Sequence, residues 1–256
     1  MLVEFGWILQ MTNKSLIIIS QPRSISTLCY RVCHNSIADI QSIPMLKNRT
    51  ELLNSVTNPM CKAIPHLSSE TFYPKLATLL YHYRFNHIVK DVVQTPNLVK
   101  FLNKHPNAYN RLILLRNIAD VAYFMLKQNW LWPLKILNLP HNTLQEKIQK
   151  NDILPLFCLS IREIREKYIQ QINCPIIHHN DFISSETYIY DILEDFGYTV
   201  TRKPYIGKTF RFETQKRQQQ KATRLYKHIE AIFSDIKNQT LETILDGYNG
   251  KVEENN

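Results

Sequence analysis

The chain has 256 residues, enough for one large domain or two small ones, and its net charge of +9 favours an acidic partner such as nucleic acid or an anionic membrane surface. A mean hydropathy of −0.27 and a longest uncharged run of 13 residues exclude a membrane-spanning helix, which needs about 20 apolar residues. Only five glycines are present and none lies between residues 7 and 196, which excludes the usual glycine-rich phosphate loops and nucleophile elbows there.

The amino-terminal segment has the composition of a mitochondrial transit peptide. Before Asp39 its one acidic residue is Glu4, while basic residues, serines and threonines are frequent around a short apolar patch at residues 16–19. We therefore predict a targeting segment over residues 1–38, cleaved near His34, and a location in the mitochondrial matrix. The alternative is a docking tail whose composition is accidental.

Cysteine usage gives little support for a metal site. Cys29, Cys33 and His34 are residue types that bind zinc, but no second pair of ligands follows them. Cys61, Cys158 and Cys174 are scattered along the chain, a pattern typical of free thiols in a reducing compartment. We expect no bound metal and no cofactor.

The middle of the chain reads as a series of helices. Residues 39–67 are rich in Pro and Asn and suggest a partly ordered lead-in, and residues 68–174 suggest a helical domain. The strongest pattern lies in residues 106–137, where Leu112, Leu115 and Ala119 recur at helical spacing. Other helices are expected from Ser69, over Ile88–Val93, from Pro96 with Thr95 as the N-cap, after Asn142, and over Ile153–Ile172. The predicted fold class is mostly α, an irregular helical bundle or α-solenoid.

A change of composition near residue 175 suggests a second unit, a helix–hairpin–helix module over residues 175–247 with a disordered tail over 248–256. The first helix follows Ser185 and ends at Gly197, the residue favoured just after a helix. Strands are then expected over residues 198–202 and 208–213, followed by a helix over residues 214–236.

The basic part of this module is the predicted binding site. Lysine and arginine contact phosphates, and exposed aromatic rings stack on unpaired bases. Adjacent residues point in different directions, so His178, His179 and Asp181 are interpreted as part of a loop, and no catalytic residues are predicted. The alternative is a solvated basic face that pairs with the preceding acidic helix. The predicted nucleic-acid-binding residues are Arg202, Lys203, Tyr205, Lys208, Phe210, Arg211, Lys216, Arg217, Lys221 and Arg224.

Two short segments resemble known families. Residues 117–123 and 129–136 resemble the central segment of the peroxins that elongate peroxisomes, which implies a membrane-associated role. Residues 204–213, after the helix that ends at Gly197, are similar to a segment of the FAST-kinase-like mitochondrial RNA-binding proteins, which implies RNA binding.

The predicted function follows from these patterns. We expect a mitochondrial matrix protein of organellar gene expression that binds RNA or a ribosomal or ribonucleoprotein partner through its basic carboxyl-terminal module. It is expected not to be an enzyme and to take no small-molecule substrate. The alternative is a scaffold that lays amphipathic helices on an organelle membrane, in the manner of the peroxins.

Overall fold

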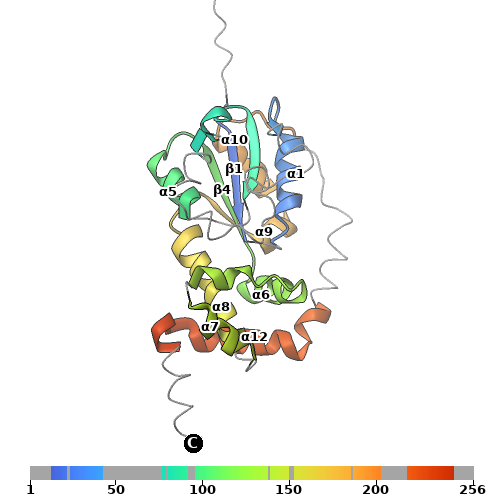
Figure 1. The fold of residues 1–256 in the computed structure, drawn as a ribbon. Coiled ribbons are helices and arrows are strands. Elements are labelled where there is room, and N and C mark those ends of the chain that lie inside the picture. The colour runs from blue at the N-terminus through green and yellow to red at the C-terminus, as the bar shows by residue number, and fades with distance from the viewer. Residues whose placement is uncertain are drawn as a thin grey trace, which may run out of the picture.

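The computed structural model describes residues 13–21, 24–42, 77–78, 80–91, 96–137, 139–149, 153–185, 187–202 and 218–244. Its centre is a five-stranded sheet in the order β2-β3-β1-β4-β5, in which each pair of neighbours is parallel (Figure 1). The strands are β1 (Leu16–Ser20), β2 (Gln41–Ser42), β3 (His87–Asp91), β4 (Asn110–Leu115) and β5 (Ile176–His178).

Helices cover both faces of this sheet and its carboxyl edge. Among the described residues, the helices up to the middle of the chain include α1 (Ser26–Ser36), α5 (Pro96–Lys104), α6 (Ile118–Lys127) and the 3-10 helix η3 (Trp132–Leu137). After them come α7 (His141–Gln149), α8 (Ile153–Glu163), the π-helix η4 (Ile164–Ile169), α9 (His179–Ser184), α10 (Thr187–Asp195), α12 (Arg224–Asp235) and η5 (Ile236–Asn238). No helix within the described ranges is long and apolar enough to cross a membrane.

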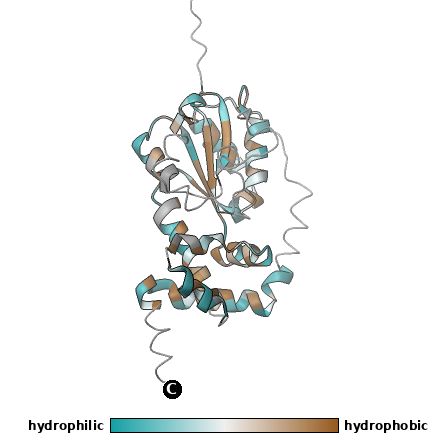
Figure 2. Ribbon diagram, viewed as in Figure 1, coloured by the Kyte–Doolittle hydropathy of each residue, from teal (hydrophilic) through white to brown (hydrophobic). Residues whose placement is uncertain are grey.

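The central strands are buried on both faces because each face meets its own layer of helices. Side chains of a strand alternate between the faces, so Leu16 and Ile18 pack with α1, α9 and α10, whereas Ile17 and Ile19 pack with α5, α6 and α8. Figure 2 shows the resulting concentration of apolar residues in the strands. Such double burial is typical of parallel sheets and explains the unbroken apolar run of β1.

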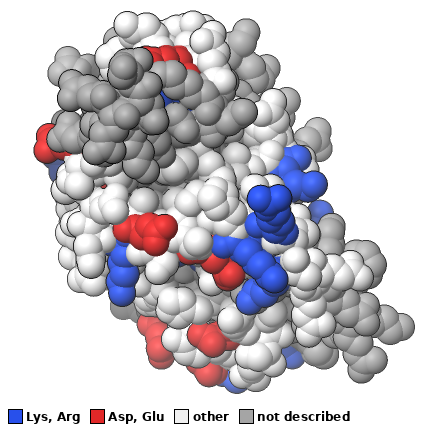
Figure 3. Space-filling model, turned by 90° about the horizontal axis from the view of Figure 1, so that it is seen from below, with Lys and Arg blue, Asp and Glu red and all other residues white. Residues whose placement is uncertain are grey.

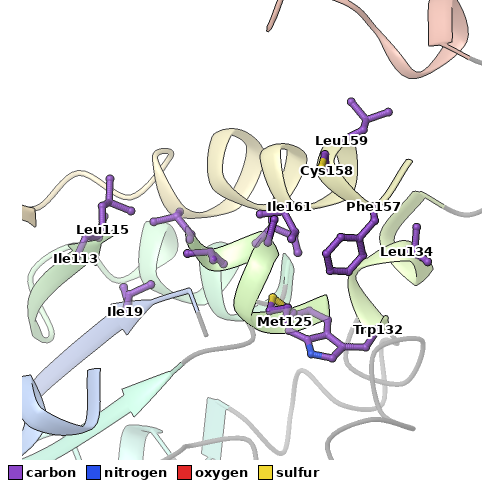
Figure 4. Close-up of a cluster of buried hydrophobic side chains, with 14 of the residues drawn as sticks. Ile19, Ile113, Leu115, Met125, Trp132, Leu134, Phe157, Cys158, Leu159 and Ile161 are labelled. Atoms are coloured by element: carbon purple, nitrogen blue, oxygen red, sulfur yellow. The ribbon is translucent and has the colours of Figure 1, made fainter. Parts of the chain in front are cut away.

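The apolar cluster that contains Ile17 and Ile19 continues beyond the edge of the sheet. The carboxyl ends of the strands meet α6, α8 and η3, and α12 packs on the far side of α6 and α8 (Figures 1 and 4). The cluster labelled in Figure 4 includes Ile19, Ile113, Leu115, Met125, Trp132, Leu134, Phe157, Cys158, Leu159 and Ile161. The carboxyl edge of the sheet is thus held against a rigid helical layer.

This architecture corrects the predicted fold class: the protein is α/β and is not a helical bundle or an α-solenoid. The stretch expected to be one helix over residues 106–133 divides into β4 and α6. Asn117 separates them, since its side-chain oxygen accepts hydrogen bonds from the amides of Ala119 and Asp120 and so caps α6. The helix expected over residues 88–93 is instead β3 at residues 87–91.

The predicted segmentation of the chain does not match these elements. The supposed targeting segment contains the central strand β1 and the helix α1, so cleavage near His34 would remove the middle of the sheet. The boundary expected near residue 175 falls inside the same sheet, because β5 pairs with β4. The matrix location itself is not tested by the fold and stays a prediction.

Several predicted elements are confirmed. Helices begin at Pro96 and Ile153 as expected, and Gly197 follows α10 with a φ of 83°. In contrast, residues 198–202 hold only an isolated bridge, between Val200 and Ile37, where a strand was predicted. The second predicted strand and the turn before it lie outside the described residues.

Candidate functional site

The candidate site lies at the carboxyl ends of the strands, beside β1. From β1 the chain runs through α1 to the side of the sheet that holds β2 and β3, while β4 and β5 lie on the other side. The strand order therefore reverses at β1. In open parallel sheets, ligands bind in the crevice that this reversal leaves at the carboxyl edge.

The described residues between β1 and α1 include one left-handed residue and no glycine. Ile25, the residue before α1, has a φ of 54°, in the left-handed region that a β-branched side chain disfavours by about 1–2 kcal/mol. Glycine would take this conformation freely. The sequence prediction excluded a glycine-rich phosphate loop because glycine is absent, and the structure places isoleucine in the left-handed conformation directly before α1.

The first turn of α1 presents hydrogen-bond donors without acceptors. No side chain caps this helix, no acidic residue lies in its first turn, and the amides of Ser26 and Thr27 have no acceptor in the described part of the chain. The hydroxyl of Ser24 is fully buried and also lacks a partner among the described residues. Unsatisfied donors at a helix amino terminus, together with the helix dipole, favour an anion.

A buried cation stands beside these donors. Lys90, on β3 next to β1, is 2% exposed, and its Nζ donates to the Thr27 hydroxyl at 2.7 Å. The ammonium group is held at the first turn of α1, where it adds a full positive charge to the partial charge of the helix terminus.

A second part of the site is a cavity of about 360 Å³ at the ends of β4 and β5. Its lining residues are Leu115, Asn117, His178, His179, Asn180 and Asp181, five of which are polar. His178 is the last residue of β5 and is exposed, whereas His179 is buried in the first turn of α9. The histidine pair that the sequence analysis assigned to a loop therefore lines a pocket on the carboxyl edge.

A buried network holds the backbone that follows β4. Arg116 pairs with Asp120 through its Nε, 2.9 Å from the carboxylate, and the Tyr226 hydroxyl donates to the other carboxylate oxygen at 2.7 Å. All three side chains are at most 5% exposed. Since Tyr226 belongs to α12, this network ties the carboxyl-terminal helix to the edge of the site.

The predicted nucleic-acid-binding residues do not form part of this site where they are described. Arg202 is exposed and pairs with Asp191 and Glu194 of α10, as in the alternative of a solvated basic face. Those ion pairs raise the pKa of Arg202 and lower that of Glu194, chiefly through their hydrogen bonds. Lys221 and Arg224 are exposed near the start of α12, and the other seven predicted residues lie outside the described residues.

The face that includes α7 and α12 carries charges of both signs. Figure 3 shows Lys and Arg side chains there in small groups, interspersed with Asp and Glu. A nucleic-acid surface is expected to be a basic patch or stripe. On the visible part of this face, the basic groups of the described residues lie next to acidic ones.

Comparison with known proteins gives a faint likeness to enzymes. No family model matches the chain, and no curated protein matches its sequence. A crystal structure from Alicyclobacillus acidocaldarius is similar with a TM-score of 0.44 and 13% identity, over 89% of this chain and 96% of that one. A domain from the curacin biosynthetic pathway is similar with a TM-score of 0.41 and 12% identity, over 76% of each chain. Both are sulfotransferases.

These findings correct the predicted function. The architecture is a parallel α/β sheet, and the described part of the chain contains no helix–hairpin–helix module. The predictions of an RNA-binding protein of organellar gene expression and of a peroxin-like membrane scaffold depended on a helical fold and are wrong, and the expectations of no enzymatic role and no small-molecule substrate lose their basis with them. The signal that sequence reasoning missed was the run Leu16–Ser20, a stretch rich in isoleucine that ends in Ser20 and is followed by a helix.

Proposed function

We propose that this protein is an enzyme that binds the phosphate or sulfate group of a small-molecule substrate at the β1–α1 junction and catalyses transfer of that group. The observation that carries the proposal is the fully buried Ser24 hydroxyl, which has no partner in the described part of the chain. A buried hydroxyl normally forms a hydrogen bond. Its position directly before the uncapped helix α1 and near Lys90 supports an anionic oxygen as the missing partner.

The donors at this junction suit the chemistry of group transfer. Fixed amides and a buried ammonium group stabilise negative charge that develops on phosphoryl or sulfuryl oxygens, and in a buried site they act more strongly than in water. Such transfer depends mainly on positioning and electrostatics. In the proposed site, the amides of Ser26 and Thr27 and the ammonium group of Lys90 position the transferred group and stabilise its charge. The proposal includes no bound metal.

The polar cavity at β4 and β5 gives room for the rest of the substrate or for an acceptor. Neighbouring strands lie about 5 Å apart, so the cavity begins roughly 5–10 Å from the end of β1. His178 lines it, and an imidazole in such a position accepts a proton from an acceptor hydroxyl. The proposed site thus combines an anion pocket with a neighbouring acid–base group.

Calorimetric titration with inorganic phosphate, sulfate, ATP and a phosphosulfate nucleotide tests the proposal. Ser24→Ala should weaken binding of the preferred anion by about 10- to 150-fold, the equivalent of one hydrogen bond to a charged group. It should leave thermal stability unchanged, because the hydroxyl has no hydrogen bond to lose among the described residues.

The matched control is Ser36→Ala, which alters a buried serine at the other end of α1 and should not change anion binding. Lys90→Met, which keeps most of the apolar stem, should also weaken binding. Failure of all four probes to bind, or equal binding by Ser24→Ala, would refute the proposal. Transfer itself is measured with radiolabelled donors, and His178→Ala should then reduce turnover more than binding.

A further inference from the structure

A second charged group, Arg165 of the helical layer, lies against the carboxyl ends of β1 and β4. Arg165 lies in the π-helix η4, a type of distortion that is frequent at functional sites. Its Nε and Nη2 donate to the side-chain oxygen of Gln21 at 2.8 and 2.5 Å, and Nη2 also donates to the Arg116 carbonyl at 2.6 Å. Gln21 follows β1 and Arg116 follows β4, so the guanidinium group bridges the two strand ends that border the crevice.

The partner of Arg165 is itself fixed. Gln21 is 1% exposed, and its amide nitrogen donates to the Ile161 carbonyl of α8. The guanidinium group is therefore held by a rigid acceptor on one strand and by backbone on the next. Its position does not depend on a flexible loop.

The bonding partners of this guanidinium group are neutral. Within the described part of the chain, no carboxylate pairs with Arg165 and no acceptor meets its Nη1. Burial lowers the pKa of Arg165 to about 10, against the opposing field of Glu166, whose own carboxylate lies 3.7 Å from Arg162. By contrast, Arg116 in the same crevice is paired with Asp120.

A largely buried cation that contacts only neutral oxygens is costly unless an anion completes its surroundings. Three of the five N–H groups of Arg165 hold it in place, which leaves the two of Nη1 for an oxyanion. Guanidinium groups bind phosphate, sulfate and carboxylate with directed, charge-assisted hydrogen bonds. The fixed geometry removes most of the entropy cost of that contact.

We propose that Arg165 forms a second anion subsite in the crevice, distinct from the β1–α1 junction, which binds an oxyanion carried by the substrate or by a co-substrate. The proposal rests on the proposed function, because it assumes that the crevice is the ligand site. The two subsites lie on opposite sides of the end of β1, since Lys90 and Thr27 are on the β3 side and Arg165 is on the β4 side. The ligand set accordingly carries two separate anionic groups.

Protection of Arg165 against phenylglyoxal tests the inference on the unmodified protein. This reagent attacks unprotonated guanidine, so a buried arginine with a lowered pKa should react, and its modification is mapped by peptide mass spectrometry. Sulfate or phosphate at tenfold its dissociation constant should slow modification of Arg165 about tenfold by occupancy, whereas chloride at equal ionic strength should not. Arg202, exposed and ion-paired on α10, serves as the internal control and should show no anion-dependent change.

The arms of the experiment separate the outcomes. If ATP or the phosphosulfate nucleotide alone protects Arg165, both anionic groups belong to one ligand. If protection requires a further anion, the subsite belongs to a co-substrate. Either result supports the proposal. Unprotected Arg165 in a protein that still binds anions through Ser24 overturns this inference and leaves the proposed function standing. Absence of binding at both subsites overturns both.

A pair of variants gives an independent readout. Arg165→Gln should weaken binding of the protecting anion about tenfold, and Arg165→Lys should recover part of the loss because it restores the charge without the fork geometry. Arg202→Gln removes the same charge elsewhere and should leave binding unchanged. Equal affinity of Arg165→Gln and the unmodified protein would contradict the subsite.

Discussion

Replacing Tyr226 by Phe tests the network that joins the carboxyl-terminal helix to the site. The change removes one hydroxyl, which donates to the buried Asp120 carboxylate at 2.7 Å, and keeps the ring that packs edge-on against Tyr123 with centroids 5.7 Å apart. No cavity larger than the hydroxyl is made. The expected cost is that of a hydrogen bond to a buried charge, about 2 kcal/mol, which lowers the melting temperature of a chain of this size by about 4–8 °C.

The assay is urea unfolding followed by tryptophan fluorescence, with calorimetry for the melting temperature. Tyr188→Phe is the control, since that side chain is 46% exposed on α10 and should change the free energy of unfolding by less than about 0.5 kcal/mol. A double-mutant cycle with Asp120→Asn should give a coupling energy of about 1 kcal/mol or more. A loss below about 0.5 kcal/mol for Tyr226→Phe, or zero coupling, would show that this contact does not hold α12 in place.

Three further predictions concern stability and thiol chemistry. Deleting residues 1–38 removes β1 and α1 and should abolish cooperative unfolding. Deleting residues 1–12 leaves each described element in place and should preserve cooperative unfolding. A folded product of the longer deletion would refute the topology. Burial raises the pKa of Cys158 and of Cys174 to about 12, so both should react with iodoacetamide at pH 8 far more slowly in the folded protein than in urea, and rapid labelling of the folded form would contradict this. Burial, opposed by the charge of Arg84, likewise raises the pKa of Tyr109 to about 12. The neutral Tyr109 hydroxyl therefore contributes its full stabilisation below the unfolded pKa near 10, and this stabilisation should be lost as the pH rises from about 10 to 12. The loss should appear as a falling urea midpoint over that pH range.

The helices on the outside of the fold were predictable because their signals are local. Pro96 at a first helical position, the start at Ile153 and Gly197 after α10 are each set by a few neighbouring residues. The central strands carry no such signal. β1 and β4 are apolar on both faces, so they lack the alternation that identifies a half-buried strand, and short apolar runs of this kind also fit a transit peptide or a helix.

The site was not predictable for a related reason: its parts are distant in sequence. Lys90 and Thr27 are 63 positions apart, and Arg165 and Gln21 are 144 apart, so each pair is brought together only by strand order. The absence of glycine did not exclude a left-handed residue before α1, because Ile25 takes the conformation that glycine usually supplies. The backbone strain at Ile25 becomes a marker of the site only after the fold is known.

The place of β1 in the chain also affects how the protein is made. The most buried strand of the sheet is synthesised first, but its two partners follow about 70 and 90 residues later, at residues 87–91 and 110–115. At typical elongation rates of about 5–20 residues per second, the stretch LIIIS stays without its partner strands for several seconds. An unpaired apolar β-branched segment favours aggregation during that interval. Yield in a cell-free system should consequently depend on added chaperones more strongly than the stability of the finished fold would suggest.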